Sequence, residues 1–65
     1  MTNQTLFYFS SVSELTALTN FHVETGSELF FVVASDEDNQ PALVAEFSVS
    51  AQAALFCEMC IALNQ

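Results

Sequence analysis

The chain has 65 residues, of which 52% are hydrophobic, and it carries eight acidic side chains but no lysine or arginine, for a formal net charge of −8. This length predicts one small domain, which buries only about 60% of the surface of its unfolded chain, and therefore argues against a deep catalytic pocket. The hydrophobic content excludes a disordered acidic tail, and the charge disfavours direct binding to nucleic acid or to anionic membranes.

The sequence indicates a cytoplasmic protein made of one compact acidic domain over residues 1–65. The N-terminal segment has no basic residue, and its apolar run Leu6–Phe9 is shorter than the core of a signal peptide. The longest apolar run, Leu29–Ala34, is too short to span a membrane. No repeat or linker divides the chain.

The first part of the chain predicts a strand followed by a helix. Thr5–Phe9 is rich in aromatic residues, as strands often are, and two serines follow it. Ser11 precedes Glu14 by three residues, which is the spacing of a capping box at a helix N-terminus. Because apolar residues then recur at three-residue steps, we expect a short helix over Val12–Asn20.

The middle of the chain predicts two strands joined by an acidic turn. Residues 22–27 are expected to form a connection, with Gly26 at a turn that needs positive φ. Glu28–Ser35 is apolar on both faces, which suits a central strand covered on two sides or one that exposes hydrophobic surface. Asp36–Gln40 predicts a turn, and Ala42–Phe47 predicts the third strand.

The end of the chain predicts a helix over Ala51–Leu63, because it is rich in alanine and other helix formers. One side of this helix gathers Leu55, Phe56, Met59, Ala62 and Leu63. The opposite side, with Cys57, Ile61 and Ala54, is expected to be an outer face that forms a dimer or partner surface, unless it is core assigned to the wrong side. The expected oligomeric state is a monomer or a weak homodimer. The fold class is α+β, in the order β-α-β-β-α, with a three-stranded, largely antiparallel sheet and two helices on one face.

The chemical motifs favour a protein that is not an enzyme. Cys57 and Cys60 have the Cys-x-x-Cys spacing but lie inside the last helix, whereas redox enzymes place such a pair at a helix N-terminus. We therefore expect reduced thiols that are buried or lie at an interface. His22 is the only histidine, and no nucleophile motif surrounds it. The sequence predicts no catalytic residue, no metal and no cofactor.

The acidic side chains are the candidate binding residues. Asp36-Glu37-Asp38 begins a calcium-loop pattern, but Pro41 and Phe47 stand where that pattern needs Gly and Glu. The segment is therefore interpreted as a solvated turn or as a contact element for a basic partner. Side chains two apart on a strand lie about 6.7 Å from one another, so acids on adjoining strands and turns can form rows on the scale of phosphate spacing. The predicted partner-binding residues are Asp36, Glu37 and Asp38, supported by Glu28, Glu24 and Glu46.

In its size, its lack of Lys and Arg, its Asp36-Glu37-Asp38 turn and its α+β pattern, the whole chain resembles small acidic DNA-mimic proteins of phages and mobile elements, including some type I anti-CRISPR proteins. The resemblance rests on no shared motif. It implies an inhibitor in the bacterial host cell that blocks the positively charged site of a basic DNA-binding protein or CRISPR effector complex, near its recognition site for the protospacer-adjacent motif. The alternative is a small interaction or assembly module, antitoxin-like or an adaptor, that uses the apolar face of the C-terminal helix.

Overall fold

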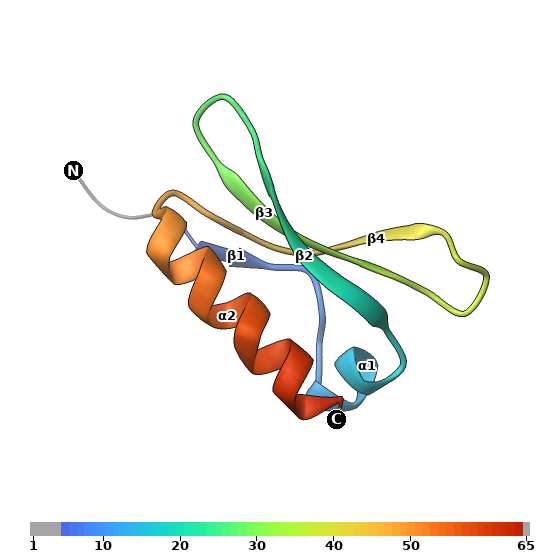
Figure 1. Cartoon of the computed structure of the whole chain (residues 1–65). Coiled ribbons are helices and arrows are strands. Elements are labelled where there is room, and N and C mark those ends of the chain that lie inside the picture. Colours follow the sequence, from blue (N-terminus) through green and yellow to red (C-terminus); the bar gives the residue numbers. More distant parts are fainter. Residues whose placement is uncertain (1–4, 65) are drawn as a thin grey trace.

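A four-stranded antiparallel sheet with one long helix lying across it forms the protein (Figure 1). The computed structural model describes residues 5–64. The strands lie in the order β1-β4-β3-β2, so β3 and β4 are central and β1 and β2 form the edges. In chain order the elements are β1 (Thr5–Phe7), α1 (Val12–Thr16), β2 (Thr19–Thr25), β3 (Phe30–Ser35), β4 (Pro41–Phe47) and α2 (Ser50–Leu63).

The predicted α+β class is confirmed, but the predicted sheet lacked one strand. The helix expected over Val12–Asn20 ends at Thr16, and the residues expected to form its end and a connection form β2 instead. In β2, the apolar residues Phe21 and Val23 alternate with the polar residues His22 and Glu24, and Phe21 is buried in the core. This alternation has the period of a strand, and it is the signal that the prediction missed. The order is therefore β-α-β-β-β-α.

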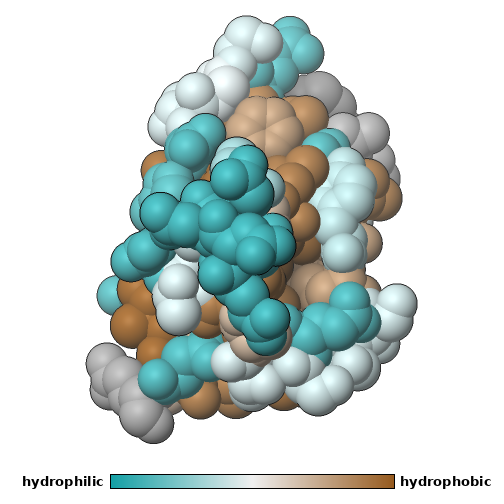
Figure 2. Space-filling view, turned by 90° about the vertical axis from the view of Figure 1, so that its right-hand side faces the viewer, coloured by the Kyte–Doolittle hydropathy of each residue, from teal (hydrophilic) through white to brown (hydrophobic). Residues whose placement is uncertain are grey.

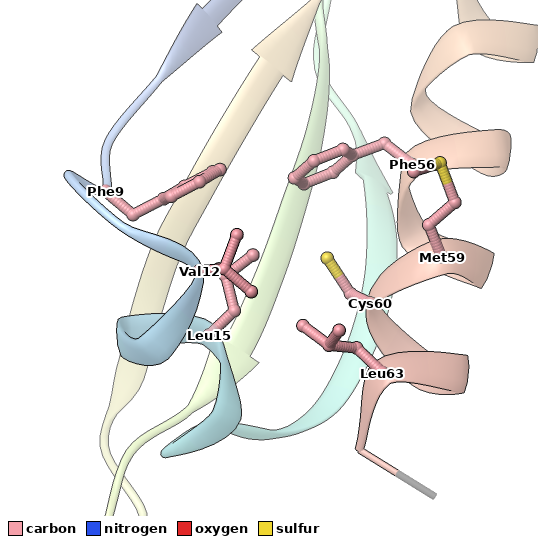
Figure 3. Close-up of a pocket in the computed structure, with 7 residues that line it drawn as sticks. All are labelled: Phe9, Val12, Leu15, Phe56, Met59, Cys60 and Leu63. Atoms are coloured by element: carbon pink, nitrogen blue, oxygen red, sulfur yellow. The ribbon is translucent and has the colours of Figure 1, made fainter.

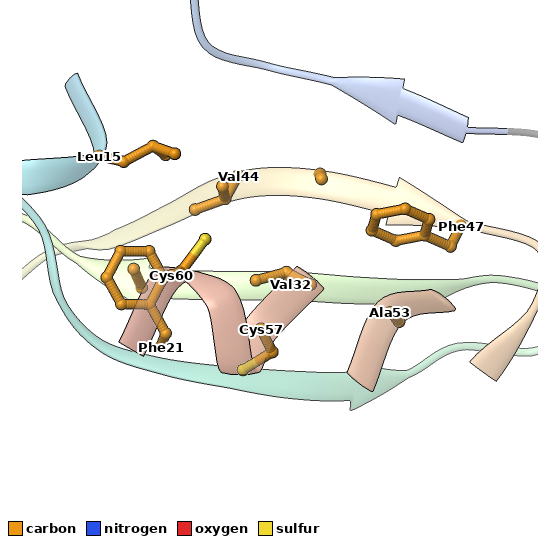
Figure 4. Close-up of a cluster of buried hydrophobic side chains, with 10 residues drawn as sticks. Leu15, Phe21, Val32, Val44, Phe47, Ala53, Cys57 and Cys60 are labelled. Carbon is orange, nitrogen blue, oxygen red and sulfur yellow. The ribbon is translucent and has the colours of Figure 1, made fainter. Parts of the chain in front are cut away.

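Both helices lie on one face of the sheet, as predicted. α2 packs against β2, β3 and β4, and Leu15 of α1 joins the same core (Figure 4). No helix of residues 5–64 lies on the other face of the sheet. The buried core consists of Leu15, Phe21, Val32, Ala34, Val44, Ala45, Phe47, Ala53, Cys57 and Cys60.

The orientation predicted for α2 is wrong in part, because Ala54 and Ile61 are exposed as expected but Cys57 is not. Cys57, expected on the outer face, is buried together with Ala53 and Cys60, whereas Leu55 and Met59 are 62% and 67% exposed. α2 has apolar side chains on all of its faces, so periodicity alone could not identify its buried side. The side with the small residues faces the sheet, which lets the helix and the sheet pack closely.

Four phenylalanine rings pack together between β1 and α2. Phe7 and Phe9 come from β1 and the segment after it, Phe47 from β4, and Phe56 from α2. Their ring centroids lie 5.4 to 5.9 Å apart, in edge, tilted and stacked arrangements. Such pairs stabilise a fold beyond the area that they bury. They give the short strand β1 a firm attachment.

Gly26 lies in the β2–β3 hairpin for a steric reason and not for the positive φ that was predicted. Positive φ occurs at Asn20 (58°) and Asn39 (63°), and Gly26 does not adopt it. A Cβ atom at Gly26 would lie 2.7 Å from Cε2 of Phe31 and 3.1 Å from the carbonyl oxygen of Leu29. The glycine therefore makes room for the Phe31 ring.

Gly26→Ala is expected to lower the free energy of unfolding by about 1–3 kcal/mol, because the added methyl group must displace the Phe31 ring. Urea denaturation measures this change. Ser27→Ala, at the exposed neighbouring position, is the control and should have a small effect. In a Phe31→Leu background the cost of Gly26→Ala should shrink. An unchanged cost in that background would contradict the steric explanation.

Candidate functional site

All eight carboxylates lie at the protein surface, and six of them belong to exposed residues. No charged side chain is buried in the part of the chain that the structure describes. Within residues 5–64 the only possible ion pair joins Nε2 of His22 to Oε2 of Glu24, at 2.9 Å, and it forms when His22 is protonated. The negative field of the protein is therefore almost unneutralised from within.

The tip of the β3–β4 hairpin is shaped by Asp36 itself. Its Oδ1 accepts hydrogen bonds from the backbone N–H groups of Asp38 and Gln40, both at 2.9 Å. Asn39, with positive φ, completes the turn, and its N–H donates to the carbonyl oxygen of Asp36 at 2.9 Å. Asp36 therefore stabilises the turn, and Glu37 and Asp38 are the charges that the tip presents to solvent.

Figure 2 faces the end of the molecule that carries this hairpin and shows hydrophilic side chains gathered in the foreground, with hydrophobic surface beside them. The carboxylates of Glu37 and Asp38 are exposed and accept no hydrogen bond from another described residue. A cation on a partner can approach both without displacing an internal contact.

Asp36→Ala is expected to lower the free energy of unfolding by about 1–2 kcal/mol, because two backbone N–H groups lose their acceptor. Asp36→Asn should cost less, since the amide oxygen can still accept. Denaturation curves of the two variants separate the turn-forming role of Asp36 from its charge. Equal losses for Ala and Asn would show that the acceptor oxygen is not what matters.

Glu24 and Glu46 lie on the open face of the sheet. The strand register places them in one cross-strand row with Phe31 between them and Leu6 beyond Glu46. Because neighbouring strands are about 4.8 Å apart, the two acidic positions are separated by roughly 10 Å. The hydroxyl group of Tyr8 donates to Oε2 of Glu46 at 2.7 Å, and this hydrogen bond raises the pKa of Tyr8. The open face is thus both apolar and anionic.

The surroundings of His22 favour its protonated form. Nδ1 lies 2.9 Å from the carbonyl oxygen of Asn20, and Nε2 lies 2.9 Å from Oε2 of Glu24. Both partners are acceptors, so the ring satisfies both only when it is protonated. The hydrogen bond to Asn20, followed by that to Glu24, raises the pKa of His22 above its ordinary value.

Because the pKa of His22 is raised in the folded state, its contribution to stability is complete below the unfolded-state pKa of about 6.5 and disappears as the pH rises through the folded-state value. The free energy of unfolding is therefore expected to fall slightly over that window. NMR titration of His22 and denaturation at several pH values measure both quantities. In Glu24→Gln the pKa of His22 should be lower. Titration of His22 in the wild type at or below its ordinary pKa would contradict this arrangement.

The six predicted partner-binding acids do not form one surface. The β2–β3 hairpin with Glu28 and the β3–β4 hairpin with Asp36–Asp38 project from opposite ends of the sheet (Figure 1). The six residues of β3 between them span about 20 Å. Glu24 and Glu46 share one cross-strand row on the open face.

The acids divide into those with a structural partner and those without. Glu14 belongs to the first group: its Oε2 accepts the N–H groups of Ser10 at 2.8 Å and Ser11 at 3.1 Å, which confirms its predicted capping role. Glu58, which the prediction did not include among the contacts, is exposed on α2. Four carboxylates make no hydrogen bond or ion pair with another described residue, and we call them the free carboxylates: Glu28, Glu37, Asp38 and Glu58.

The two cysteines belong to the core. Cys57 and Cys60 are free and buried, and desolvation raises the pKa of both thiols. They are therefore thiols rather than reactive thiolates at neutral pH. Among residues 5–64, no group of three or more His, Cys, Asp or Glu side chains is placed to hold a metal ion.

In the described part of the chain, no helix has the length and the apolar character needed to cross a membrane. The candidate site is an anionic surface spread over two hairpins, the open sheet face and α2. Comparison of the chain with protein-family models, curated proteins and solved structures gave no match.

Proposed function

We propose that the protein occupies the positively charged DNA-binding surface of a partner protein and thereby competes with duplex DNA. The observation that supports this proposal is the set of eight surface carboxylates in a chain without Lys or Arg. Self-repulsion of these charges lowers the stability of the fold, and only the His22–Glu24 pair offsets it within the described residues. The uncompensated field steers the protein toward a basic surface.

The charge density limits the form that such mimicry takes. The Cα trace measures 36 × 19 × 19 Å, and a duplex of that length carries roughly 21 phosphates at one charge per about 1.7 Å. The chain has only eight acids. The protein therefore replaces several phosphate contacts rather than a whole duplex, and the remaining affinity must come from apolar contacts that a phosphate backbone cannot make.

The resemblance to small acidic inhibitors names one target class to test first. In that case the partner is a type I CRISPR effector complex, and the protein binds near the region that recognises the protospacer-adjacent motif. Adding the protein to a purified complex before the target duplex should then prevent duplex binding. Adding it after the duplex should have little effect.

A broader test needs no assumption about the target. The protein is immobilised, incubated with bacterial lysate at low salt, and eluted with a short DNA duplex. The proposal predicts that the eluted proteins bind DNA and that the protein blocks this binding after each is purified. Partners that stay bound at physiological salt and at saturating duplex would contradict the proposal.

A second candidate function is an assembly or adaptor module that uses the apolar face of α2. The exposure of Leu55 and Met59 favours it, because a small monomer seldom exposes such residues together. An interface of this kind is less sensitive to salt than a charged one and does not compete with DNA. The lysate experiment therefore distinguishes the two functions.

A further inference from the structure

An apolar groove lies between α2 and the segment that runs from β1 into α1 (Figure 3). Leu15 and Cys60 are buried at its base, and the half-buried rings of Phe9 and Phe56 line it. Its volume is about 190 Å³. Cofactor and drug-sized pockets begin at about 300 Å³, so the groove has the size for one large side chain.

The rim of the groove is apolar and accessible to solvent. Val12, Met59 and Leu63 line it and are 57%, 67% and 44% exposed. The side chain of Asn64 joins its two walls, because Nδ2 donates to the carbonyl oxygens of Leu15 at 3.2 Å and Cys60 at 3.1 Å. The groove is therefore held in shape before any partner arrives, which lowers the entropic cost of filling it.

We infer that this groove receives one apolar anchor side chain of a basic polypeptide partner. The inference takes from the proposed function only the basic character of the partner. Oε2 of Glu14 is hydrogen-bonded to the backbone N–H groups of Ser10 and Ser11, which stand between Phe9 and Val12 in the chain. This places a carboxylate beside the rim, where a Lys or Arg next to the anchor residue would meet it.

Charge also argues against a second copy of the chain as the occupant. Two copies would each bring a net charge of −8 and no Lys or Arg to the contact. A cationic segment instead gains from the whole field of the protein. A buried apolar anchor surrounded by charged contacts is the usual arrangement at a protein interface, where the anchor supplies much of the affinity.

The probe for the inference is a synthetic helical Ala–Lys peptide with one central phenylalanine. Two comparison peptides replace the phenylalanine by alanine, or all lysines by glutamate. Isothermal titration measures affinity, and NMR follows the methyl groups of Val12, Met59 and Leu63. The phenylalanine peptide is expected to bind about 10- to 100-fold more tightly than the alanine peptide, which is the factor for burying one aromatic side chain. The glutamate peptide should not bind.

Two variants of α2 provide a matched pair. Met59 and Leu55 are similarly exposed on the same helix, but only Met59 lines the groove. Met59→Gln should abolish the preference for the phenylalanine peptide, whereas Leu55→Gln should keep it. Because both positions are on the surface, both variants should fold.

Three results would overturn the inference: equal affinity for the phenylalanine and alanine peptides, equal behaviour of Met59→Gln and Leu55→Gln, or tight binding of the glutamate peptide. Shifts at the groove methyl groups when the protein alone is concentrated would identify a second copy as the occupant and would also overturn it. The peptide assay contains no DNA. A failure of DNA competition with the peptide preference intact would therefore count against the proposed function and not against the groove.

Discussion

Phe47→Ala is expected to lower the free energy of unfolding by about 3–5 kcal/mol. Phe47 is only 5% exposed, and its ring centroid lies 5.9 Å from that of Phe7 and 5.6 Å from that of Phe56. Removing it leaves a cavity where β1, β4 and α2 meet. A domain of 65 residues has a total stability of roughly 3–10 kcal/mol, so this one change removes much of it.

Urea denaturation followed by circular dichroism measures this loss. Phe47→Leu should cost less, since it keeps part of the buried volume. Leu55→Ala is the surface control, and its effect should stay within about 0.5 kcal/mol because Leu55 is exposed. A loss below about 1 kcal/mol for Phe47→Ala would mean that the phenylalanine cluster does not hold β1 and α2 together.

Replacing the four free carboxylates by amides is expected to change stability and binding in opposite directions. The variant combines Glu28→Gln, Glu37→Gln, Asp38→Asn and Glu58→Gln, and it reduces the net charge from −8 to −4 because four acids become neutral. At low salt it should be at least as stable as the wild type, since self-repulsion decreases and no internal bond of these carboxylates is lost. Its affinity for a basic partner should fall by up to about 30-fold, the value for contacts at all four positions worth roughly 0.5 kcal/mol each.

The matched control neutralises the other four acids, Glu14, Glu24, Asp36 and Glu46, and so has the same net charge. These carboxylates hold backbone groups, the His22 ring or the Tyr8 hydroxyl. The control variant should therefore lose stability, unlike the variant of the free carboxylates. If both variants show the same stability, the division of the acids into two groups has no energetic meaning.

The parts of the fold that depend on local patterns could be predicted from the sequence. The capping role of Glu14 follows from its spacing from Ser11, and the predicted helix over Ala51–Leu63 differs from α2 by one residue at its start. The β3–β4 hairpin follows from two apolar runs around a polar turn. In each case neighbouring residues determine the structure.

The parts that depend on tertiary packing could not be predicted in this way. β2 was missed because three-residue steps of apolar side chains suggested that the helix continued, although pairing with β3 is what stabilises Thr19–Thr25 as a strand. Cys57 was assigned to the outer side of α2 because a helix with apolar residues on every side gives no preference. The buried side is determined by packing against the sheet, where the small side chains of Ala53 and Cys57 fit.

The candidate site was predicted in its chemistry but not in its arrangement. That the acids are on the surface and lack Lys or Arg partners is a matter of composition. The arrangement depends on the fold. It includes the turn that Asp36 stabilises, the position of Glu28 at the far end of the sheet from that turn, and the lack of a partner for Glu58. The groove joins Phe9 to Met59, and no local pattern brings such distant residues together.

In the proposed function, the carboxylates of this protein take the place of DNA phosphates on a basic surface. The most direct measurement uses a DNA-binding partner obtained from the duplex elution and compares how well the wild type and the four-amide variant displace a labelled duplex from it at low and at physiological salt. The proposal predicts displacement by the wild type that weakens as salt rises, and displacement by the four-amide variant that needs more protein, up to about 30 times as much. Equal displacement by the two proteins, independent of salt, would contradict the proposal.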